Sequence, residues 1–212
     1  MSSAKVLVLG ANGMLGKMVA LYLDSAKDLD VEITSRSKNE FVIENFDGNY
    51  YILDANKLDQ NPLEEIIKIC DYDYIVNCIG IIKPKINEND VDSITNTILI
   101  NSYFPQKIHK LAFENDINYI QIGTDCVFSG LGGQYTEVSY KDALDLYGKS
   151  KIVGEIEGSN KIVIRSSIIG PEQGIGFSLM NWFLNNQELV VSGYKNHMWN
   201  GVTTLNFAKI IE

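Results

Sequence analysis

Val6-Leu7-Val8-Leu9 leads directly into Gly10-Ala11-Asn12-Gly13-Met14-Leu15-Gly16, and a segment of helical period follows. A tight turn, a close approach of backbone to pyrophosphate and the packing of a helix on a strand each favour glycine at one of these positions. A flexible turn would also account for the glycines alone, but their place between strand and helix favours a dinucleotide site. We expect a dinucleotide to contact Gly10, Asn12, Gly13, Met14, Leu15 and Gly16.

The rest of the chain alternates short apolar runs with longer segments of helical period, which is typical of βαβ units and a parallel sheet. We expect about seven strands, at residues 5–9, 31–34, 50–53, 74–78, 119–122, 161–165 and 189–191. Helices are expected at 14–23, 63–70, 93–114, 141–157 and 177–186. The pattern predicts a Rossmann-like, doubly wound α/β fold, which binds ligands at the carboxyl ends of its strands.

The C-terminal segment, residues 203–212, begins like a helix with a threonine cap and stops after about two turns. We expect residues 1–170 to form the cofactor-binding domain and to carry the catalytic residues. Residues 171–212 are expected to begin a substrate-binding portion that is small or truncated. This pattern is compatible with a fragment of a longer protein as well as with a short natural chain.

The composition narrows the class of protein. A formal net charge of −9 leaves no basic excess that would attract nucleic acid or anionic lipid, so we expect neither partner. Three cysteines without a Cys-x-x-Cys pair, and an N-terminus without a charged region or a long apolar segment, predict a cytoplasmic location. The two histidines lack partners at ligand spacing, so no metal site is expected.

Cofactor identity is suggested by the end of the second predicted strand, Thr34-Ser35-Arg36-Ser37. Folds that select NAD place an acidic side chain there to bind the ribose hydroxyls. No carboxylate is present to repel a 2′-phosphate, and the planar guanidinium of Arg36 can pair with one, with a hydrogen bond added by Ser35. A solvated loop cation is the alternative. We expect NADP(H) to be preferred and NAD(H) to be accepted.

Further cofactor contacts are expected at the ends of the third and fourth predicted strands. Asp54 could accept the adenine amino group, although a solvated acid is equally consistent with its position. Cys78, Ile79 and Gly80 end the fourth strand, where the backbone could approach the cofactor; a structural turn would also favour glycine there.

The catalytic prediction rests on Tyr147, Lys151 and Thr124. Tyr147 and Lys151 are four residues apart on a predicted helix and so share a face. A phenol of pKa about 10 becomes a useful acid when an ammonium and a cationic nicotinamide stabilise its phenolate. Thr124 follows a strand and could hydrogen-bond a substrate carbonyl. An amphipathic helix contact and a strand-end cap are the alternatives, but all three residues together predict carbonyl reduction.

Three motifs carry a more specific resemblance: Thr124-Asp125-Cys126-Val127-Phe128-Ser129-Gly130, Tyr135-Thr136-Glu137, and Tyr147-Gly148-Lys149-Ser150-Lys151 with Gly154-Glu155. The chain resembles the dTDP-4-dehydrorhamnose reductase branch of the extended short-chain dehydrogenases/reductases. The resemblance implies reduction of the 4-keto group of a dTDP- or UDP-linked deoxy-sugar for polysaccharide synthesis.

The same resemblance assigns several further roles. It implies that Asn101 supports the catalytic lysine through water, and it favours binding over the alternative at Asp54. A nucleotide sugar is the implied partner, and its expected contacts are Thr124, Asp125, Val127, Phe128 and Trp199. A tryptophan at position 199 is also common in a core or an interface.

Other activities share these features. A nucleotide-sugar epimerase or dehydratase has the same fold and Tyr/Lys pair, but a dehydratase usually has Asp-Glu after the threonine, where this chain has Asp125-Cys126. A non-catalytic regulatory protein that binds NADP(H) is a further alternative. The sequence is also compatible with a homodimer.

Overall fold

The computed structural model describes residues 3–38, 44–57, 62–156, 158–172, 178–187 and 189–212. Its centre is a six-stranded, fully parallel sheet of order β3-β2-β1-β4-β5-β6. The strands are β1 (Ala4–Leu9), β2 (Leu29–Ser35), β3 (Tyr50–Ile52), β4 (Tyr74–Asn77), β5 (Asn118–Ile122) and β6 (Lys161–Ile164). The strand order reverses between β1 and β4, so a crevice opens beyond their carboxyl ends. The predicted doubly wound fold is confirmed.

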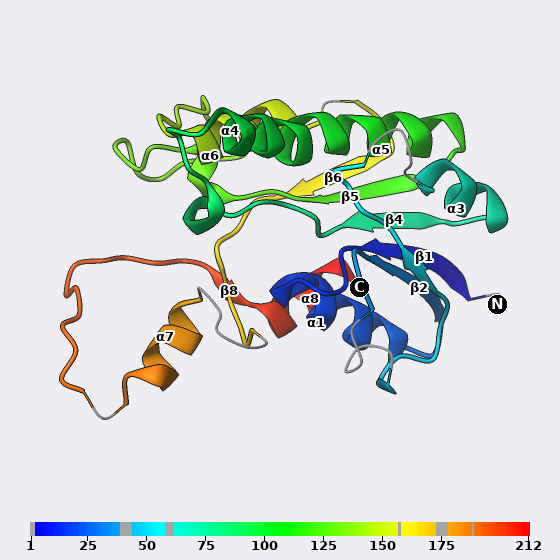
Figure 1. The fold of residues 1–212 in the computed structure, drawn as a ribbon, viewed down its shortest axis with the longest axis horizontal. Coiled ribbons are helices and arrows are strands. Elements are labelled where there is room, and N and C mark those ends of the chain that lie inside the picture. Colours follow the sequence, from blue (N-terminus) through cyan, green and yellow to red (C-terminus); the bar gives the residue numbers. More distant parts are fainter. Residues whose placement is uncertain (1–2, 39–43, 58–61, 157, 173–177, 188) are drawn as a thin grey trace.

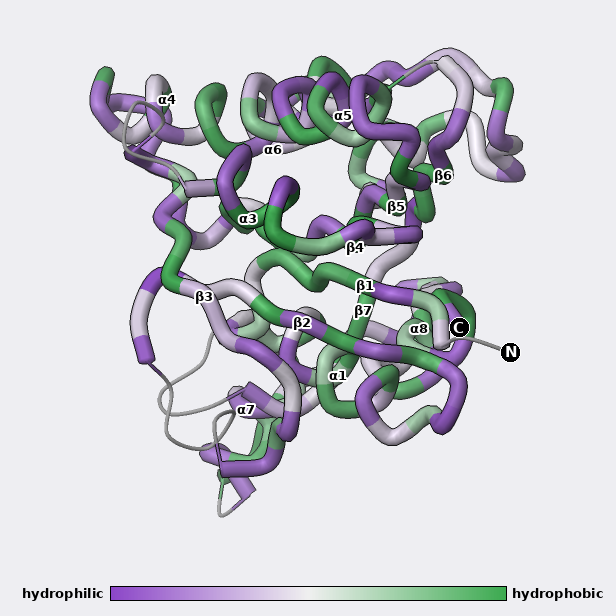
Figure 2. The backbone as a smooth tube through the Cα atoms, turned by 90° about the vertical axis from the view of Figure 1, so that its right-hand side faces the viewer, coloured by the Kyte–Doolittle hydropathy of each residue, from purple (hydrophilic) through white to green (hydrophobic). Residues whose placement is uncertain are grey.

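Burial on both faces explains why β1 is a continuous apolar run. Leu7, Val8 and Leu9 are fully buried, and β1 pairs with β2 on one side and with β4 on the other. When helices cover both faces of a strand, every side chain points into a core, so polar and apolar residues do not alternate along it. Figure 2 shows this apolar strand in the middle of the molecule.

Helices cover both faces of the sheet, as Figure 1 shows. One face carries α1 (Met14–Asp24) and α8 (Thr204–Ile211), whose apolar residues share one core cluster. The other face carries α3 (Leu63–Ile69), α4 (Val91–Ile98), α5 (Phe104–Glu114) and α6 (Leu146–Gly154). Among the described residues, no helix combines the length and apolar character needed to cross a membrane.

The C-terminal helix α8 packs beside α1 in the helical layer on one face of the sheet. Phe207 and Ala208 are fully buried beside Val19 of α1, and the C-terminus lies next to that helix (Figure 1). Thr203 caps α8 by accepting a hydrogen bond from Asn206 N at 3.1 Å, as its sequence suggests. Phe207 and Ala208 therefore belong to the same core cluster as the apolar residues of α1, and the expected division at residue 170 stays a prediction.

The predicted helix at 93–114 is continuous but contains a π-helical turn, Leu99–Tyr103, between α4 and α5. Pro105 has no N–H, so the carbonyl of Asn101, four residues earlier, cannot make its α-helical hydrogen bond. Such widened turns recur at functional sites. Here the turn faces α6, the helix with Tyr147 and Lys151.

Two predictions in the C-terminal third need correction. Residues 189–191 do not form a strand: Leu189 and Val190 are exposed, lie in an irregular segment and are not paired with any strand of the described residues. A separate parallel pair instead joins β7 (Ile168–Ile169) to β8 (Val202–Thr203). Strands of two residues have no alternation, so the sequence pattern could not predict them.

Two helices, α6 and α7, are shorter than predicted. Helix α6 begins at Leu146 instead of 141, because the Asp145 carboxylate accepts a hydrogen bond from Gly148 N at 2.7 Å and so caps the helix there. Helix α7 (Leu179–Asn185) matches its prediction within two residues at its N-terminus and one at its C-terminus, and it stands away from the sheet (Figure 1). Residues 157 and 177, the outer limits of the two predictions, lie outside the described residues.

Candidate active site and dinucleotide groove

The glycine turn is so tight that Gly10 and Gly16 leave no room for a side chain. Gly10 has φ +86°, and a Cβ on Gly16 would lie 2.2 Å from the Gly10 carbonyl oxygen. Gly13 is the N-cap of α1 and has no side chain to accept a hydrogen bond from the first helical turn. The N–H groups of that turn therefore remain available to an anion, as in other phosphate-binding helix starts.

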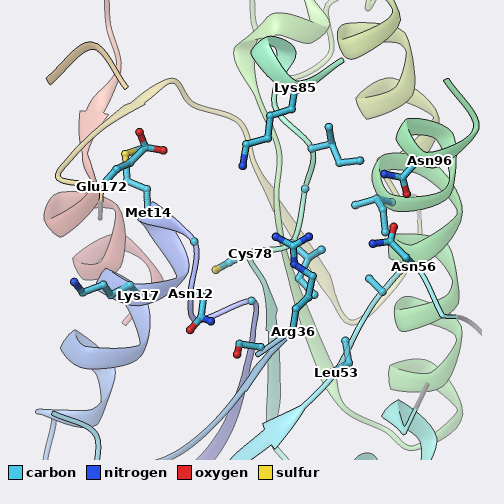
Figure 3. Close-up of a pocket in the computed structure, with 18 of the residues that line it drawn as sticks. Asn12, Met14, Lys17, Arg36, Leu53, Asn56, Cys78, Lys85, Asn96 and Glu172 are labelled. Carbon is cyan, nitrogen blue, oxygen red and sulfur yellow. The ribbon is translucent and has the colours of Figure 1, made fainter. Parts of the chain in front are cut away.

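A cavity of about 460 Å³ opens in front of this turn (Figure 3). Most of the predicted cofactor residues line it: Gly10, Asn12, Gly13, Met14, Ser35, Arg36, Cys78, Ile79 and Gly80. They come from the ends of β1, β2 and β4, which is where the strand order reverses. The cavity thus occupies the ligand crevice expected of a doubly wound sheet.

Other predicted cofactor residues lie behind the cavity wall. The side chain of Leu15 packs in the core, and Gly16 packs against Gly10. The Asp54 carboxylate accepts hydrogen bonds from the backbone and side-chain nitrogens of Asn56, both at 3.1 Å. Leu53 and Asn56, on either side of that turn, do line the cavity. Adenine binding by Asp54 itself stays a prediction.

The loop after β2 is held by a small hydrogen-bond network. The Ser35 hydroxyl contacts Tyr50 and donates to the Ser37 carbonyl at 2.5 Å, and Asn12 Nδ2 donates to the same carbonyl at 2.9 Å. Ser35 therefore supports the loop, while Arg36 extends into the cavity (Figure 3). Asn12 Oδ1 is buried without a partner among the described residues, so the site fits a ligand with hydroxyl groups, such as a ribose.

The cavity also has charged residues that the sequence analysis missed. Lys17, Lys85 and Glu172 line it, and Figure 3 shows Lys85 on the opposite side from Arg36. Lys17 lies one turn beyond Gly13 on the same helix, so helical spacing could have indicated it. Lys85 and Glu172 come from loops far from the glycine turn, and no local pattern places them there.

The structure places Thr124 in hydrogen-bond contact with Tyr147, and Lys151 on the same helix lies next to Gly80 of the groove. Thr124 is buried after β5 and accepts a hydrogen bond from Cys126 N at 3.2 Å. Lys151 Nζ donates to the Ile122 carbonyl at 2.9 Å. A Cβ on Gly80, which lines the cavity, would lie 3.8 Å from Lys151 Nζ.

Burial shifts the pKa values of the two titratable catalytic residues, Tyr147 and Lys151. Burial raises the pKa of Tyr147 to about 12, and a hydrogen bond from the Thr124 hydroxyl opposes that shift. Burial also lowers the pKa of Lys151 to about 8, which the negative charge of Glu155 opposes. At neutral pH the pair consists of a neutral phenol, which can donate a proton, and a largely protonated ammonium.

Asn101 connects the cofactor loop to the catalytic helix. Its Oδ1 accepts a hydrogen bond from Ile81 N at 2.8 Å, and its Nδ2 donates to the Ile81 carbonyl at 2.9 Å and to Ser150 Oγ at 3.1 Å. The side chain is fully buried and lines neither cavity, so it supports the groove from behind. Its carbonyl oxygen is so close to α6 that a Cβ on Gly154 would lie 1.9 Å from it.

A second cavity, of about 820 Å³, is lined by Asp125 and Cys126, which directly follow Thr124. Thr124, Tyr147 and Lys151 themselves line neither of the two cavities. Of the predicted substrate residues, Asp125 and Phe128 line it, and the Asp125 carboxylate accepts hydrogen bonds from Ser167 Oγ at 2.7 and 2.9 Å. Val127 is fully buried and is placed for packing rather than for ligand contact. Trp199 lines neither cavity and packs against Gly201.

The family follows from a comparison with known proteins. Residues 4–191 match the family model of the RmlD substrate binding domain. The chain belongs to this family. This RmlD-family chain is also 30% identical over 153 residues to methionine adenosyltransferase 2 subunit beta of Danio rerio, a match that covers 72% of the chain and 43% of that relative. It spans about two-fifths of the length of the curated relatives it matches.

Solved structures show the same fold. A dTDP-4-dehydrorhamnose reductase from Bacillus anthracis, in complex with NADP, is 18% identical with a TM-score of 0.76, and the match covers 100% of this RmlD-family chain and 70% of that one. A Bordetella bronchiseptica enzyme in complex with NAD and UDP is 16% identical with a TM-score of 0.78, over 99% and 68% of the two chains. The predicted resemblance in fold is confirmed.

Proposed function

We propose that the protein reduces the 4-keto group of a dTDP- or UDP-linked deoxy-sugar with NAD(P)H, in the synthesis of polysaccharide precursors. The observation that carries this proposal is the position of Thr124, Tyr147 and Lys151. Gly80, next to Lys151, lines a groove suited to a dinucleotide, and Asp125, next to Thr124, lines a second cavity that a sugar could fill. Binding of a nucleotide alone would not need a proton donor such as Tyr147 close to the groove.

The chain's own residues would manage the proton in this reaction. The reduced nicotinamide, when bound, supplies a hydride to the carbonyl carbon. The Thr124 hydroxyl holds the carbonyl oxygen, and the Tyr147 phenol donates its proton to that oxygen as negative charge develops there. The Lys151 ammonium then stabilises the phenolate left on Tyr147. One carbonyl, one hydride and the one proton donated by Tyr147 thus give one alcohol.

The proposed cofactor is NADP(H) in preference to NAD(H). Arg36 supports this choice because it lines the cavity at the end of β2 and extends into it (Figure 3). All three cysteines are free thiols, in keeping with a cytoplasmic reaction. The division into a cofactor part at 1–170 and a substrate part at 171–212 and the homodimer stay predictions.

The proposal is tested by following NADPH absorbance with a panel of dTDP- and UDP-4-keto-6-deoxy-sugars. We expect turnover with at least one of them by the wild-type protein. Tyr147→Phe should abolish that turnover while its affinity for NADPH changes little, because only the proton donor is lost. Normal turnover by Tyr147→Phe would contradict the mechanism. Release of oxidised cofactor after each cycle distinguishes a reductase from an epimerase, which would retain it.

One observation favours a second candidate function, that of a dinucleotide-binding regulatory subunit. The 30% identity to methionine adenosyltransferase 2 subunit beta relates this chain to a subunit of another enzyme. In that case the protein should bind NADPH without reducing any sugar of the panel. It should also change the kinetics of a methionine adenosyltransferase catalytic subunit from the same organism when the two are mixed.

A further inference from the structure

The catalytic helix ends in a buried charge cluster that the proposed reaction does not use. Glu155 is the C-cap of α6, and only 3% of its side chain is exposed. Its carboxylate accepts two hydrogen bonds from Arg165, from Nε at 2.6 Å and Nη2 at 2.8 Å, and one from Lys141 Nζ at 2.9 Å. This paired geometry is the arrangement in which an arginine fixes a carboxylate in direction as well as in distance.

Arg165 links this cluster to the wall of the second cavity, because it binds Glu155 and also lines the cavity. Its Nη1 donates to the Glu137 carbonyl at 3.0 Å, and its guanidinium carbon lies 5.5 Å from the centre of the Phe128 ring. Phe128 in turn stacks on Tyr135, with ring centres 4.5 Å apart and planes 9° apart. Phe128, Tyr135, Glu137 and Arg165 all line the second cavity. The Arg165 side chain therefore contacts two parts of this wall directly, Glu137 and Phe128, and a third, Tyr135, through Phe128.

The Tyr135 ring is fixed from its other side as well. Its hydroxyl accepts a hydrogen bond from Gly132 N at 3.0 Å and lies 3.3 Å from Ser129 Oγ. Ser129 is in turn bound by the Asp142 carboxylate, through its N at 2.7 Å and its Oγ at 2.6 Å. The wall is thus held at both ends, and the Arg165 end is joined to the C-terminus of the catalytic helix through Glu155.

The electrostatics of the cluster depend on both cations. Burial raises the pKa of Glu155, but hydrogen bonds and charge attraction from Arg165 and Lys141 outweigh it, so the pKa is lowered. A buried carboxylate that loses a partner is left with unsatisfied hydrogen-bond capacity and an uncompensated charge. Because Glu155 is one turn from Lys151, its position also matters to the electrostatics of the catalytic pair.

We propose that Lys141, Glu155 and Arg165 form a positioning network that fastens the wall of the second cavity to the catalytic helix and thereby sets the affinity for the nucleotide sugar. This inference rests on the proposed function for the identity of the ligand. None of the three residues lines the dinucleotide groove. The network should therefore act on sugar binding and leave dinucleotide binding unchanged.

The opposite end of α6 offers a matched control. There Lys83 Nζ pairs with the Asp145 carboxylate at 2.6 Å, but 66% of the Lys83 side chain is exposed and neither residue lines the dinucleotide groove or the second cavity. Exposed ion pairs contribute little to stability. Lys83→Met thus removes the cation that pairs with Asp145, the N-cap of α6, and leaves the wall of the second cavity unchanged.

The experiment compares Arg165→Lys, Lys141→Met and Lys141→Arg with Lys83→Met. Arg165→Lys keeps the charge and loses the paired geometry, Lys141→Met removes the more exposed cation, and Lys141→Arg restores it. Three quantities are measured: the Kd for NADPH by fluorescence, the Kd for dTDP-glucose by calorimetry with the KM of any sugar that turns over, and amide hydrogen exchange of residues 128–137.

We expect Arg165→Lys to weaken dTDP-glucose binding or raise KM about tenfold or more, with kcat and the Kd for NADPH within about threefold. Exchange in residues 128–137 should be faster than in wild type by about tenfold. Lys141→Met should show the same pattern more weakly, Lys141→Arg should recover, and Lys83→Met should resemble wild type.

The proposal is overturned if exchange in residues 128–137 is unchanged in both Arg165→Lys and Lys141→Met, or if NADPH binding weakens as much as sugar binding. A wild-type protein without turnover would count against the proposed reduction alone, since the exchange and the binding measurements need no turnover. The two failures are therefore distinguishable.

Discussion

Lys151 is a cation in a place that disfavours charge. It is buried, and its ammonium donates to the main-chain carbonyl of Ile122. Burial lowers its pKa from the ordinary 10.5 to about 8. Between these two pH values the unfolded chain binds the proton that the folded chain releases, so the free energy of unfolding rises with pH. The residue therefore reduces stability at neutral pH.

Lys151→Met should consequently separate stability from activity. We expect the variant to lose turnover and yet to have a larger free energy of unfolding than wild type at pH 7. The difference between the two proteins should be about 2 kcal/mol smaller at pH 9.5. Urea unfolding at both pH values measures the difference. A variant that is less stable than wild type at pH 7, or equally affected at both, would show that the buried ammonium is not the source of the cost.

Arg36 provides a test of cofactor choice at the scale of one side chain. Arg36→Ala should weaken NADPH binding by ~1.5–3 kcal/mol and NADH binding far less, because only the former has a 2′-phosphate for a charge-assisted contact. Lys38→Ala is the matched control, since Lys38 is an exposed cation two residues further on that does not line the cavity. Calorimetric titration with both cofactors decides it. An equal loss for the two would remove Arg36 from the 2′-phosphate site.

At the scale of elements, the contact between α6 and the π-helical turn is the tightest constraint on the catalytic helix. A Cβ on Gly154 would lie 1.9 Å from the Asn101 carbonyl oxygen, which is backbone and cannot move independently of its turn. The same turn holds Ile81 and Ser150 through the Asn101 side chain. Any displacement there reaches both the cofactor loop and the catalytic helix.

Gly154→Ala should therefore be destabilising although alanine is the better helix former. We expect a loss of at least about 2 kcal/mol from overpacking, against a gain of up to about 1 kcal/mol from helix propensity. Val153→Ala, at a position on the same helix that is 63% exposed, is the control and should change stability little. Thermal and urea unfolding measure both. A stabilised Gly154→Ala would mean that α6 is free to shift.

Sequence patterns predicted the long elements well and the special ones poorly. The hydrophobic period and the glycine turn predicted the six strands of the sheet, helices α1 and α3, and the continuous helical segment formed by α4 and α5. Asn101 was a visible signal, because it is a poor helix former in mid-helix, but it did not reveal the π-helical turn that Pro105 favours. The apolar run at 189–191 suggested a strand because composition cannot report whether a neighbouring strand is there to pair with it.

The residues of the candidate site also fall into two groups, those that the sequence could predict and those that it could not. Residues next to the glycine turn and on the catalytic helix could be predicted, because spacing along one element fixes their relative positions. Lys85, Glu172 and the Arg165 cluster could not, since each depends on where a loop returns to the sheet. Such contacts are long-range in sequence and leave no local period.

At the scale of the whole molecule, α8 makes the sheet and its C-terminal cover one cooperative unit. Phe207→Ala should cost about 3–5 kcal/mol, because a fully buried ring between α1 and the sheet would be replaced by a cavity. Leu205→Ala, at a position that is 41% exposed, is the control and should cost much less. Urea unfolding, followed together with NADPH binding, should show a single transition for Phe207→Ala. Loss of α8 in a separate step, with NADPH binding intact, would contradict this.

The pairing of α1 with α8 also has a consequence for the nascent chain. Val19 and Phe207 share one core cluster but stand almost two hundred positions apart. At about 5–20 residues per second, a ribosome needs on the order of 10–40 s to travel from one to the other. During that interval the apolar side of α1 lacks its natural cover while the first strands are already free to pair. Chaperones that shield exposed apolar surface should therefore be most needed during synthesis, and the newly made protein should be most prone to aggregate before α8 leaves the ribosome.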